Sequence, residues 1–328
     1  MNLQLNQIDI SNIELITKWD NFVDESIEGT FYHKSYWILN NISDNFKGAQ
    51  NYKLYYLSDS NKNWIAAFYI PTSKKLGMNF IVMPHMTPFA GVMISSIIHN
   101  LTPSKKISNI KEINEIFINE LKKEKLLYYS FSPEHIDMQP FIWNKYITTV
   151  RYTYRINLVD ENILWSNLQE KTKINKGNKS NVTVKWGFEE YLDLYFELND
   201  KSFNSQNITN FNNALTKKLL IELNKNNNCI IGIIFDENNK AIGGCVLAYD
   251  KKRAYYIMGG ITRDNNYGMS YLLWNALLYT KNVLNLPVFD FEGSMIPSIE
   301  KYFRKFGGEL IPYYSLNNIL LTLKNYIK

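Results

Sequence analysis

Two carboxylates near the end of an apolar segment are the strongest candidates for chemistry in this sequence. Asp290 and Glu292 belong to the segment FDFEGS, in which Phe289 and Phe291 alternate with them. In a strand, this alternation places both carboxylates on one face and both rings on the other. Gly293 ends the segment, and the end of a buried strand is where α/β folds place their sites. Because burial raises the pKa of a carboxyl group, the pair predicts a general base, a role we assign to Glu292 before Asp290.

The helix expected after this strand contains two cations, Arg304 and Lys305, within EKYFRKFGGE. Both are candidates to bind a carboxylate or phosphate of a substrate, and Arg can do so through two parallel hydrogen bonds. Two structural interpretations stay open. The cations can complement the dipole at the end of their own helix, and Asp290 can cap a helix or pair with Arg304 while Glu292 is solvated.

The segment from Gly259 to Lys281 predicts a strand, a loop containing Gly268 and a long amphipathic helix. The first N–H groups of a helix and its dipole suit a phosphate or a developing oxyanion. Arg263 is close enough in sequence to assist with an anionic group. The alternative is a strand-to-helix turn that requires a glycine and is stabilised by Asn265 or Asn266.

Charge is distributed unevenly along the 328 residues. Residues 151–328 hold 22 Lys and Arg against 17 Asp and Glu, whereas residues 1–150 hold 14 of each, so the net charge of +5 comes from the second half. Its local source is a run of lysines that is free of acidic residues. Such a run predicts either contact with the phosphates of a nucleotide or RNA, or a solvated loop. The five lysines are Lys171, Lys173, Lys176, Lys179 and Lys185.

Several classes of protein are excluded by composition and motif. No apolar run is long enough to span a membrane, and the N-terminal residues do not have the pattern of a signal peptide. Two cysteines indicate a reducing compartment, so we expect a cytoplasmic protein. There is no P-loop, G-x-G-x-x-G, G-x-S-x-G or RNA-binding motif. No metal site is predicted from the four scattered histidines, which are His33, His85, His99 and His135.

The predicted elements occur twice in the same order. Each half contains a strand pair, a loop, a helix and a strand, which predicts a tandem duplication of a mixed α/β unit with domains at residues 1–150 and 151–328. We expect the last helix to pack back on the first domain. In the first half the elements are strands at 52–57 and 64–71, a helix at 110–123 and a strand at 126–131. In the second they are strands at 229–235, 241–249 and 254–258, helices at 269–283 and 297–306, and a strand at 288–291.

Over nearly its whole length the sequence resembles the Fem-type branch of the GNAT acyltransferase superfamily. Its most specific segments are FDFEGSM and YFRKFGG, and YLLWNALLYTK precedes them. The resemblance also rests on residues 19–23 (WDNFV), 29–33 (GTFYH), 87–91 (TPFAG) and 152–158, the last followed by the lysine run.

This resemblance implies two GNAT-like domains and transfer of an acyl or aminoacyl group to an amine, in a bacterial, cell-wall-related role. Fem-type enzymes use aminoacyl-tRNA to extend the peptide bridge of peptidoglycan precursors, whereas other GNAT members use acyl-coenzyme A. At positions of the coenzyme A phosphate loop this chain has Asn265, Gly268 and Ser270, a degenerate match that favours aminoacyl-tRNA. The acyl donor would be a co-substrate, and no tightly bound cofactor, metal or DNA is expected.

The implied site lies in the second domain, with the donor near Arg263, Asn265, Asn266, Gly268 and Ser270. Glu292 is the expected base, and we expect His33 and Tyr36 to line the same cleft from the first domain. The partners would be an amine-bearing small molecule or peptide and, through Lys173, Lys176 and Lys179, tRNA. Two alternatives stay open: an acyl-CoA-dependent N-acyltransferase, and a binding protein that kept the fold but lost the donor site.

Overall fold

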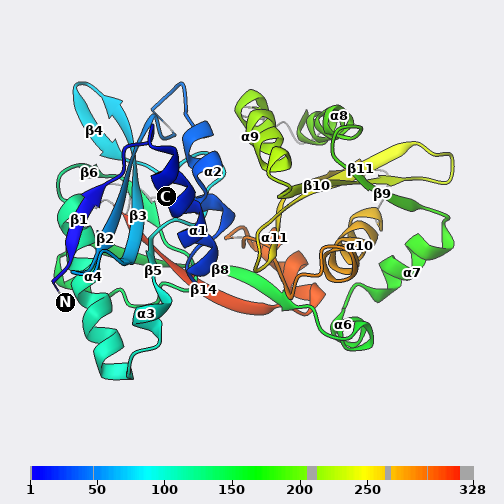
Figure 1. Ribbon diagram of the computed structural model, residues 1–328. Helices are drawn as coiled ribbons and strands as arrows, with labels where there is room; N and C mark the ends of the chain where they lie inside the picture. The colour runs from blue at the N-terminus through cyan, green and yellow to red at the C-terminus, as the bar shows by residue number, and fades with distance from the viewer. Residues whose placement is uncertain (1, 47, 205–212, 263–266, 294, 318–328) are drawn as a thin grey trace. The chain divides into compact units, whose positions relative to one another are not determined.

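The structure is a computed structural model that describes residues 2–46, 48–204, 213–262, 267–293 and 295–317 (Figure 1). The chain divides into two compact units, one of residues 1–151 together with residues from Pro312 onward, and one of residues 152–311. Two long strands, β8 (Ile147–Asn157) and β14 (Glu309–Asn317), therefore contain residues of both units. The last helix that the sequence predicts, at residues 297–306, belongs to the second unit, and the described residues after it that belong to the first unit are those of β14.

The first unit is built on a sheet of strand order β1-β2-β3-β4-β6, with β5 paired to β3. Its central strand β3 (Trp64–Lys75) is buried from Trp64 to Ser73, which accounts for the apolar run in the sequence. Helix α1 begins at Ile13 because the side chain of Asn12 accepts the N–H of Leu15. The other elements are β1 (Gln4–Gln7), α1 (Ile13–Glu25), a 3-10 helix (Phe31–His33), α2 (Ser35–Asn40), β2 (Asn51–Ser58), β4 (Met78–Ile81), β5 (Val92–Ile94), α3 (Ser96–His99), α4 (Pro103–Leu121), β6 (Lys125–Leu126), β7 (Tyr128–Ser130) and α5 (Gln139–Trp143).

In the second unit the strands follow the order β8-β13-β12-β11-β10-β9. Strands β10 and β11 are buried on both faces. Gly244 of β11 lies against Tyr195 of α8, whereas Cys245 belongs to the core beneath α10. Helices α8 and α9 accordingly lie on one face of these strands and α10 on the other (Figure 1). The elements are α6 (Glu161–Asn167), α7 (Lys171–Lys179), β9 (Thr183–Gly187), α8 (Leu192–Asn204), α9 (Asn213–Lys225), β10 (Cys229–Phe235), β11 (Ala241–Tyr249), β12 (Ala254–Ile261), α10 (Gly268–Asn282), β13 (Val288–Asp290), α11 (Pro297–Phe303) and a 3-10 helix (Arg304–Phe306).

The same type of connection, a helix between two parallel strands, occurs in each unit, as the sequence predicts. In the first, β4 and β6 are parallel neighbours joined through α4. In the second, β12 and β13 are parallel neighbours joined through α10. Each helix thus carries the chain between two parallel strands of one sheet, the usual way to connect such strands.

The lysine run is a helix followed by a strand, and its interpretation as a solvated loop is wrong. Residues 171–179 form α7, and Lys185 lies in β9. Ile174 and Gly177 are the buried residues of α7, and a Cβ at Gly177 would lie 2.5 Å from the ring of Tyr271. The helix therefore forms because it packs closely on α10, a long-range contact that local charge pattern does not reveal.

Candidate functional site

The site is organised by the separation of two parallel strands, β12 and β13. They pair only at Ala254–Phe289 and Tyr255–Asp290. Beyond these pairs β12 continues to Ile261, whereas the chain after β13 follows β8, because the N–H of Phe291 donates to the carbonyl of Tyr154 at 2.9 Å. We call the point where the strands separate, after Tyr255 and Asp290, the strand fork. The carboxyl ends of parallel strands that diverge are the usual ligand sites of α/β folds.

Asp290, the last residue of β13, is fully buried and its carboxylate is engaged within the second unit. Its Oδ1 accepts the hydroxyl of Thr153 at 2.6 Å, and its Oδ2 lies 2.6 Å from Nε of Arg155 in an ion pair. The expected alternative partner, Arg304, is not the one found. With both oxygens occupied, Asp290 fixes the end of β13, so we assign it a positioning role and not the catalytic role predicted beside Glu292.

Glu292 does not share a strand face with Asp290, and that prediction is wrong. The strand ends at Asp290, and Glu292 has a left-handed backbone with φ of 58°. Its N–H donates to Oδ1 of Asp290 at 2.8 Å, which fixes the turn. Gly293 continues the turn with φ of 83°, and a Cβ there would lie 2.0 Å from the carbonyl oxygen of Tyr152. The turn needs a glycine at this position and directs the Glu292 side chain independently of the strand.

The carboxyl group of Glu292 is poorly solvated. Its Oε1 is buried, and no other described residue makes a hydrogen bond to it. Burial raises the pKa of this carboxyl well above its ordinary value of 4.5. The residue before it in the chain, Phe291, stacks on Phe303 with ring centroids 4.5 Å apart, and Tyr256 of β12 packs on the edges of both rings. A carboxyl group with few solvating partners can act as a base near neutral pH.

Sequence reasoning did not identify Tyr256 as part of this region. In the pairing of β11 with β12, Val246 lies opposite Met258 and Leu247 opposite Tyr256, so Ile257 is an extra residue and forms a β-bulge. Bulges redirect the side chains next to them and are frequent beside sites. The pair of glycines that follows, at 259 and 260, is the only local signal of this irregularity in the sequence.

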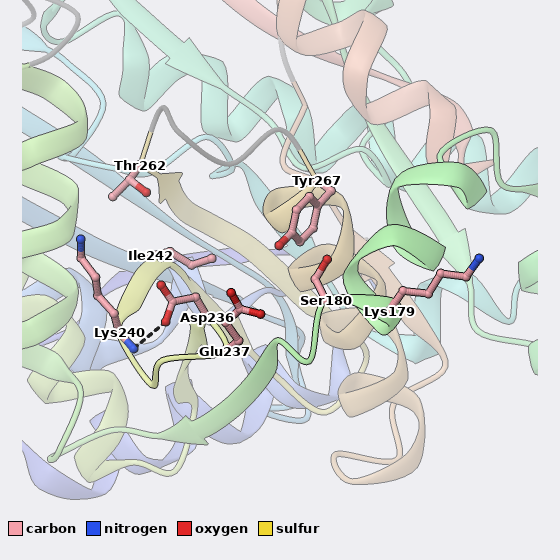
Figure 2. Close-up of a pocket in the computed structure, with 8 residues that line it drawn as sticks. All are labelled: Lys179, Ser180, Asp236, Glu237, Lys240, Ile242, Thr262 and Tyr267. Carbon is pink, nitrogen blue, oxygen red and sulfur yellow. Dashed lines mark hydrogen bonds between the residues drawn. The ribbon is translucent and has the colours of Figure 1, made fainter.

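A cavity of about 490 Å³ lies next to the first turn of α10, and we call it the α10 cavity (Figure 2). Its wall combines Lys179 and Ser180 at the end of α7 with the turn between β10 and β11. In this turn Oδ1 of Asp236 accepts the N–H of Lys240 at 2.9 Å. The helix begins at Gly268, directly after the lining residue Tyr267. The lining residues are Lys179, Ser180, Asp236, Glu237, Lys240, Ile242, Thr262 and Tyr267.

Two of the five predicted donor-binding residues, Gly268 and Ser270, lie in the described part of the chain. Gly268 is the first residue of α10 and is buried. The hydroxyl of Ser270 is engaged within the protein, because it donates to Oε2 of Glu170 at 2.7 Å and lies 3.1 Å from the hydroxyl of Tyr302. Arg263, Asn265 and Asn266 lie outside the described residues.

Glu170 is a central residue that the sequence did not reveal. Its side chain is 4% exposed, and its two oxygens lie 2.9 Å from Nζ of Lys305 and 2.9 Å from Nζ of Lys173. Burial alone would raise the pKa of Glu170, but the hydrogen bonds from Lys305, Lys173 and Ser270 lower it to about 2. This carboxylate therefore joins α7, α10 and the segment after α11, and Lys305 and Lys173 are its partners and not open anion-binding groups as predicted.

The remaining predicted cations are more accessible. The side chain of Arg304 is 54% exposed, and its Nε lies 3.5 Å from Oε1 of Glu300. Lys176 is exposed and its Nζ lies 5.2 Å from the ring centroid of Tyr267, a cation–π contact at the edge of the α10 cavity. Lys179 lines that cavity. Of the three lysines expected to contact phosphates, Lys176 and Lys179 are thus available.

The two residues expected from the first unit differ in burial. His33 is fully buried, its Nδ1 accepts the N–H of Thr30 at 3.2 Å, and its carbonyl accepts the indole N–H of Trp19 at 2.7 Å. The prediction that His33 lines a cleft is therefore wrong, because its ring closes the 3-10 helix inside the unit. Tyr36 lies on α2 and is half-buried.

Two features are absent from the described part of the chain. No three His, Cys, Asp or Glu side chains within it are placed to hold a metal ion. Among its helices, none combines the length and the apolar character needed to cross a bilayer.

Comparison with known proteins gives matches at the level of structure. No protein-family model and no curated protein sequence matches the chain. FemX is similar over 99% of both chains, with a TM-score of 0.67 and 11% identity. L-PGS from Bacillus licheniformis is similar over 85% of this chain and 87% of that chain, with a TM-score of 0.53 and 10% identity. A tandem GNAT protein from the clavulanic acid biosynthesis pathway is similar over 97% of this chain and 99% of that chain, with a TM-score of 0.51 and 7% identity.

At these identities the likeness concerns the fold. It confirms the predicted tandem GNAT-like α/β arrangement, and the likeness to FemX agrees with the Fem-type resemblance of the sequence.

Proposed function

We propose that the chain is an acyltransferase that moves an acyl or aminoacyl group to an amine. The observation that carries the proposal is the carboxyl group of Glu292, whose raised pKa and position at the strand fork suit a base for an attacking amine. The fold supports the same class, because it is shared with FemX and with a tandem GNAT protein.

In the proposed reaction the amine nitrogen attacks the carbonyl carbon of the donor and forms the new C–N bond. The carbonyl electron pair moves to oxygen, and the tetrahedral intermediate expels the sulfur or oxygen leaving group of the donor. Glu292 accepts the proton that the nitrogen loses, directly or through water. Backbone N–H groups at the start of α10 would stabilise the oxyanion. The burial of Oε1 limits the solvation of the carboxylate and so keeps it basic.

We favour an aminoacyl-tRNA donor over acyl-coenzyme A. Lys176 lies at the edge of the α10 cavity, and Lys179 lines the cavity with its ammonium group directed away from the other lining residues (Figure 2), so the two cations suit phosphates of an RNA that passes outside the cavity. Inside the cavity Asp236 and Glu237 lie beside Lys240, and the two carboxylates suit the α-ammonium group of an aminoacyl ester.

An acceptor related to peptidoglycan precursors and a cytoplasmic location remain predictions from the family resemblance and the cysteine content. The acceptor would be a small molecule or peptide with a free amine, the class that the proposed chemistry requires.

The test is a thermal melt of the whole chain with saturating aminoacyl-tRNA, acetyl-CoA or a long-chain acyl-CoA, each at low and moderate salt. A ligand at about 100 times its Kd adds about 2.7 kcal/mol of stability, which shifts Tm by several degrees. A salt-sensitive shift with aminoacyl-tRNA alone supports the proposed donor. A shift with a CoA ester overturns the donor but keeps the transferase, and no shift with any of them contradicts both.

A further inference from the structure

A second cavity, of about 160 Å³, lies in the first unit and takes no part in the proposed reaction. We call it the first-unit cavity. It is formed by the loop after α1, the end of β5, helix α3, the first half of α4 and the loop after β7. The residues that line it are Glu28, Ile94, His99, Lys106, Ile107, Ile110, Glu134, His135, Ile136 and Asp137.

Glu28 is the buried acid of this cavity, with 3% of its surface exposed. Its Oε2 accepts the hydroxyl of Ser26 at 2.7 Å and the N–H of Ile94 at 3.1 Å. Its Oε1 lies 2.9 Å from Nε2 of His99. These contacts fix the orientation of the carboxylate and leave lone pairs of Oε1 for a further donor.

His135 supplies a second acceptor and is 4% exposed. Its ring stacks on Phe131 with centroids 4.7 Å apart, and burial lowers its pKa to about 4 although Glu28 and Asp137 favour the charged form. The imidazole is therefore neutral at pH 7. One ring nitrogen bonds to the backbone of Val92, and Nε2 has no hydrogen-bond partner among the described residues. With the proton on the nitrogen that bonds to the Val92 carbonyl, Nε2 presents a lone pair.

The other walls are largely aliphatic. Ile94 is buried, whereas Ile107 and Ile136 are exposed at the rim. Three acids line the cavity, of which Asp137 is paired with Nζ of Lys111 at 2.9 Å, and the lining cation is Lys106. The acceptor oxygens of Glu28 disfavour an anionic ligand. A metal ion is also disfavoured, because no group of three ligating side chains in the described ranges is placed to hold one. A ligand with a nitrogen donor on a short hydrocarbon chain would fit these two buried acceptors and the aliphatic rim.

We propose that the first-unit cavity binds a primary ammonium group carried by a short aliphatic chain. The ammonium donates to Oε1 of Glu28 and Nε2 of His135, and its methylene groups pass between Ile107 and Ile136. Two sources share this chemistry: a free alkylamine and the side chain of a lysine in a polypeptide. The site is independent of the transferase proposal, because it uses only residues of the first unit.

The test is titration of the full chain by ligand-observed NMR with n-butylammonium, n-butanol and butyrate. The proposal predicts that butylammonium binds saturably and that neither butanol, which is neutral, nor butyrate, which is anionic, binds comparably. Glu28→Gln and His135→Phe should each weaken butylammonium by about tenfold or more, since each removes one acceptor of a buried charged group. His135→Phe keeps an aromatic ring against Phe131. Glu14→Gln, an exposed acid on α1, is the matched control and should bind as the parent does.

Thermal melts of all variants show whether each one folds, and if Glu28→Gln does not, His135→Phe decides the outcome. Equal binding of butanol, unchanged affinity in the folded variants, or no binding of butylammonium at millimolar concentration would overturn the proposal. A lysine-containing tripeptide and its Nζ-acetylated form distinguish the two sources. If the unmodified peptide binds more tightly than butylammonium, the ligand is a lysine of a polypeptide. If butylammonium binds more tightly, the ligand is a free alkylamine. Because the readout is binding in the first unit, failure here leaves the transferase proposal unaffected.

Discussion

Oδ1 of Asp290 accepts the backbone N–H of Glu292 at 2.8 Å, so the first carboxylate of the FDFEGS segment positions the second. Arg155 and Thr153 hold Asp290 itself, which ties the turn to β8. The two acids that the sequence selects as one pair therefore divide their roles. Asp290 is a buried ion-pair partner that sets the backbone, and Glu292, whose Oε1 is buried, is the residue that we propose for proton transfer.

The raised pKa of Glu292 has a consequence for stability. Between its ordinary pKa of 4.5 and its raised native pKa, this carboxyl ionises in the unfolded chain while it stays protonated in the native one. The native state then binds more protons, so this group's contribution to stability falls as pH rises, by at most about 1.4 kcal/mol per pH unit. Glu292→Gln removes this loss and should be more stable than the parent at pH 7 and nearly equal to it below pH 4. Urea denaturation across pH measures the difference, and Glu197→Gln, an exposed acid on α8, should follow the parent curve. Equal pH profiles for the parent and Glu292→Gln would contradict the burial of this carboxyl.

Gly293→Ala should destabilise the second unit and abolish transfer. The substitution combines φ of 83° with a Cβ 2.0 Å from the carbonyl oxygen of Tyr152, so the backbone must move. We expect a loss of about 1–3 kcal/mol in the free energy of unfolding. Gly77→Ala is a matched control, because Gly77 has φ of 77° with no atom within 4 Å of an added Cβ. A similar loss in both variants would show that the close contact at Gly293 is relieved without cost.

Glu170→Gln should lose both ion pairs and about 2 kcal/mol of stability at pH 7. Because the pKa of Glu170 is lowered to about 2, its contribution is present above about pH 4.5 and is lost as pH falls towards 2. The parent should therefore lose stability in that window and Glu170→Gln should not. Glu222→Gln breaks a surface pair between the half-buried Glu222 and the exposed Lys225 and should change stability by less than about 0.5 kcal/mol. Chemical denaturation at pH 7 and pH 3 makes the comparison, and equal losses at pH 7 in the two variants would rule out a special role for Glu170.

Substitutions of the lysines of α7 should have two different effects, one on RNA binding and one on stability. The double variant Lys176→Gln with Lys179→Gln should bind aminoacyl-tRNA more weakly, and the salt slope of binding should fall by about one for each phosphate that is no longer neutralised. Lys173→Gln should lower stability instead, because Lys173 pairs with Glu170. Filter binding at several salt concentrations measures the slope, with Lys201→Gln on α8 as the control. An unchanged slope in the double variant would show that α7 does not contact RNA.

Much of the fold follows from local pattern. The continuous apolar runs of β3, β10 and β11, and the amphipathic period of α1, α4 and α10, fix these elements because each is half or fully buried within its own unit. Local pattern does not predict the lysine-rich α7, since only Ile174 and Gly177 of it are buried and the contact that stabilises it lies nearly a hundred residues away at Tyr271.

The residue types of the candidate site follow from the sequence, whereas its geometry does not. A strand that ends in two carboxylates and a glycine identified Glu292, but its left-handed backbone follows from the close approach of Gly293 to Tyr152, which no local pattern shows. Similarly, Lys305 and Ser270 resemble anion-binding groups until Glu170 is seen to engage both across long stretches of chain.

The most direct test of the central claim is the rate of acyl transfer by the parent and by Glu292→Gln, with saturating donor and a panel of amine acceptors. If Glu292 accepts the proton of the amine, the parent rate rises with pH well above 4.5, and the variant loses about 100-fold or more in kcat with little change in donor affinity. Glu197→Gln should retain the parent rate. Undiminished turnover in Glu292→Gln, with the pH profile of the parent, would contradict the account.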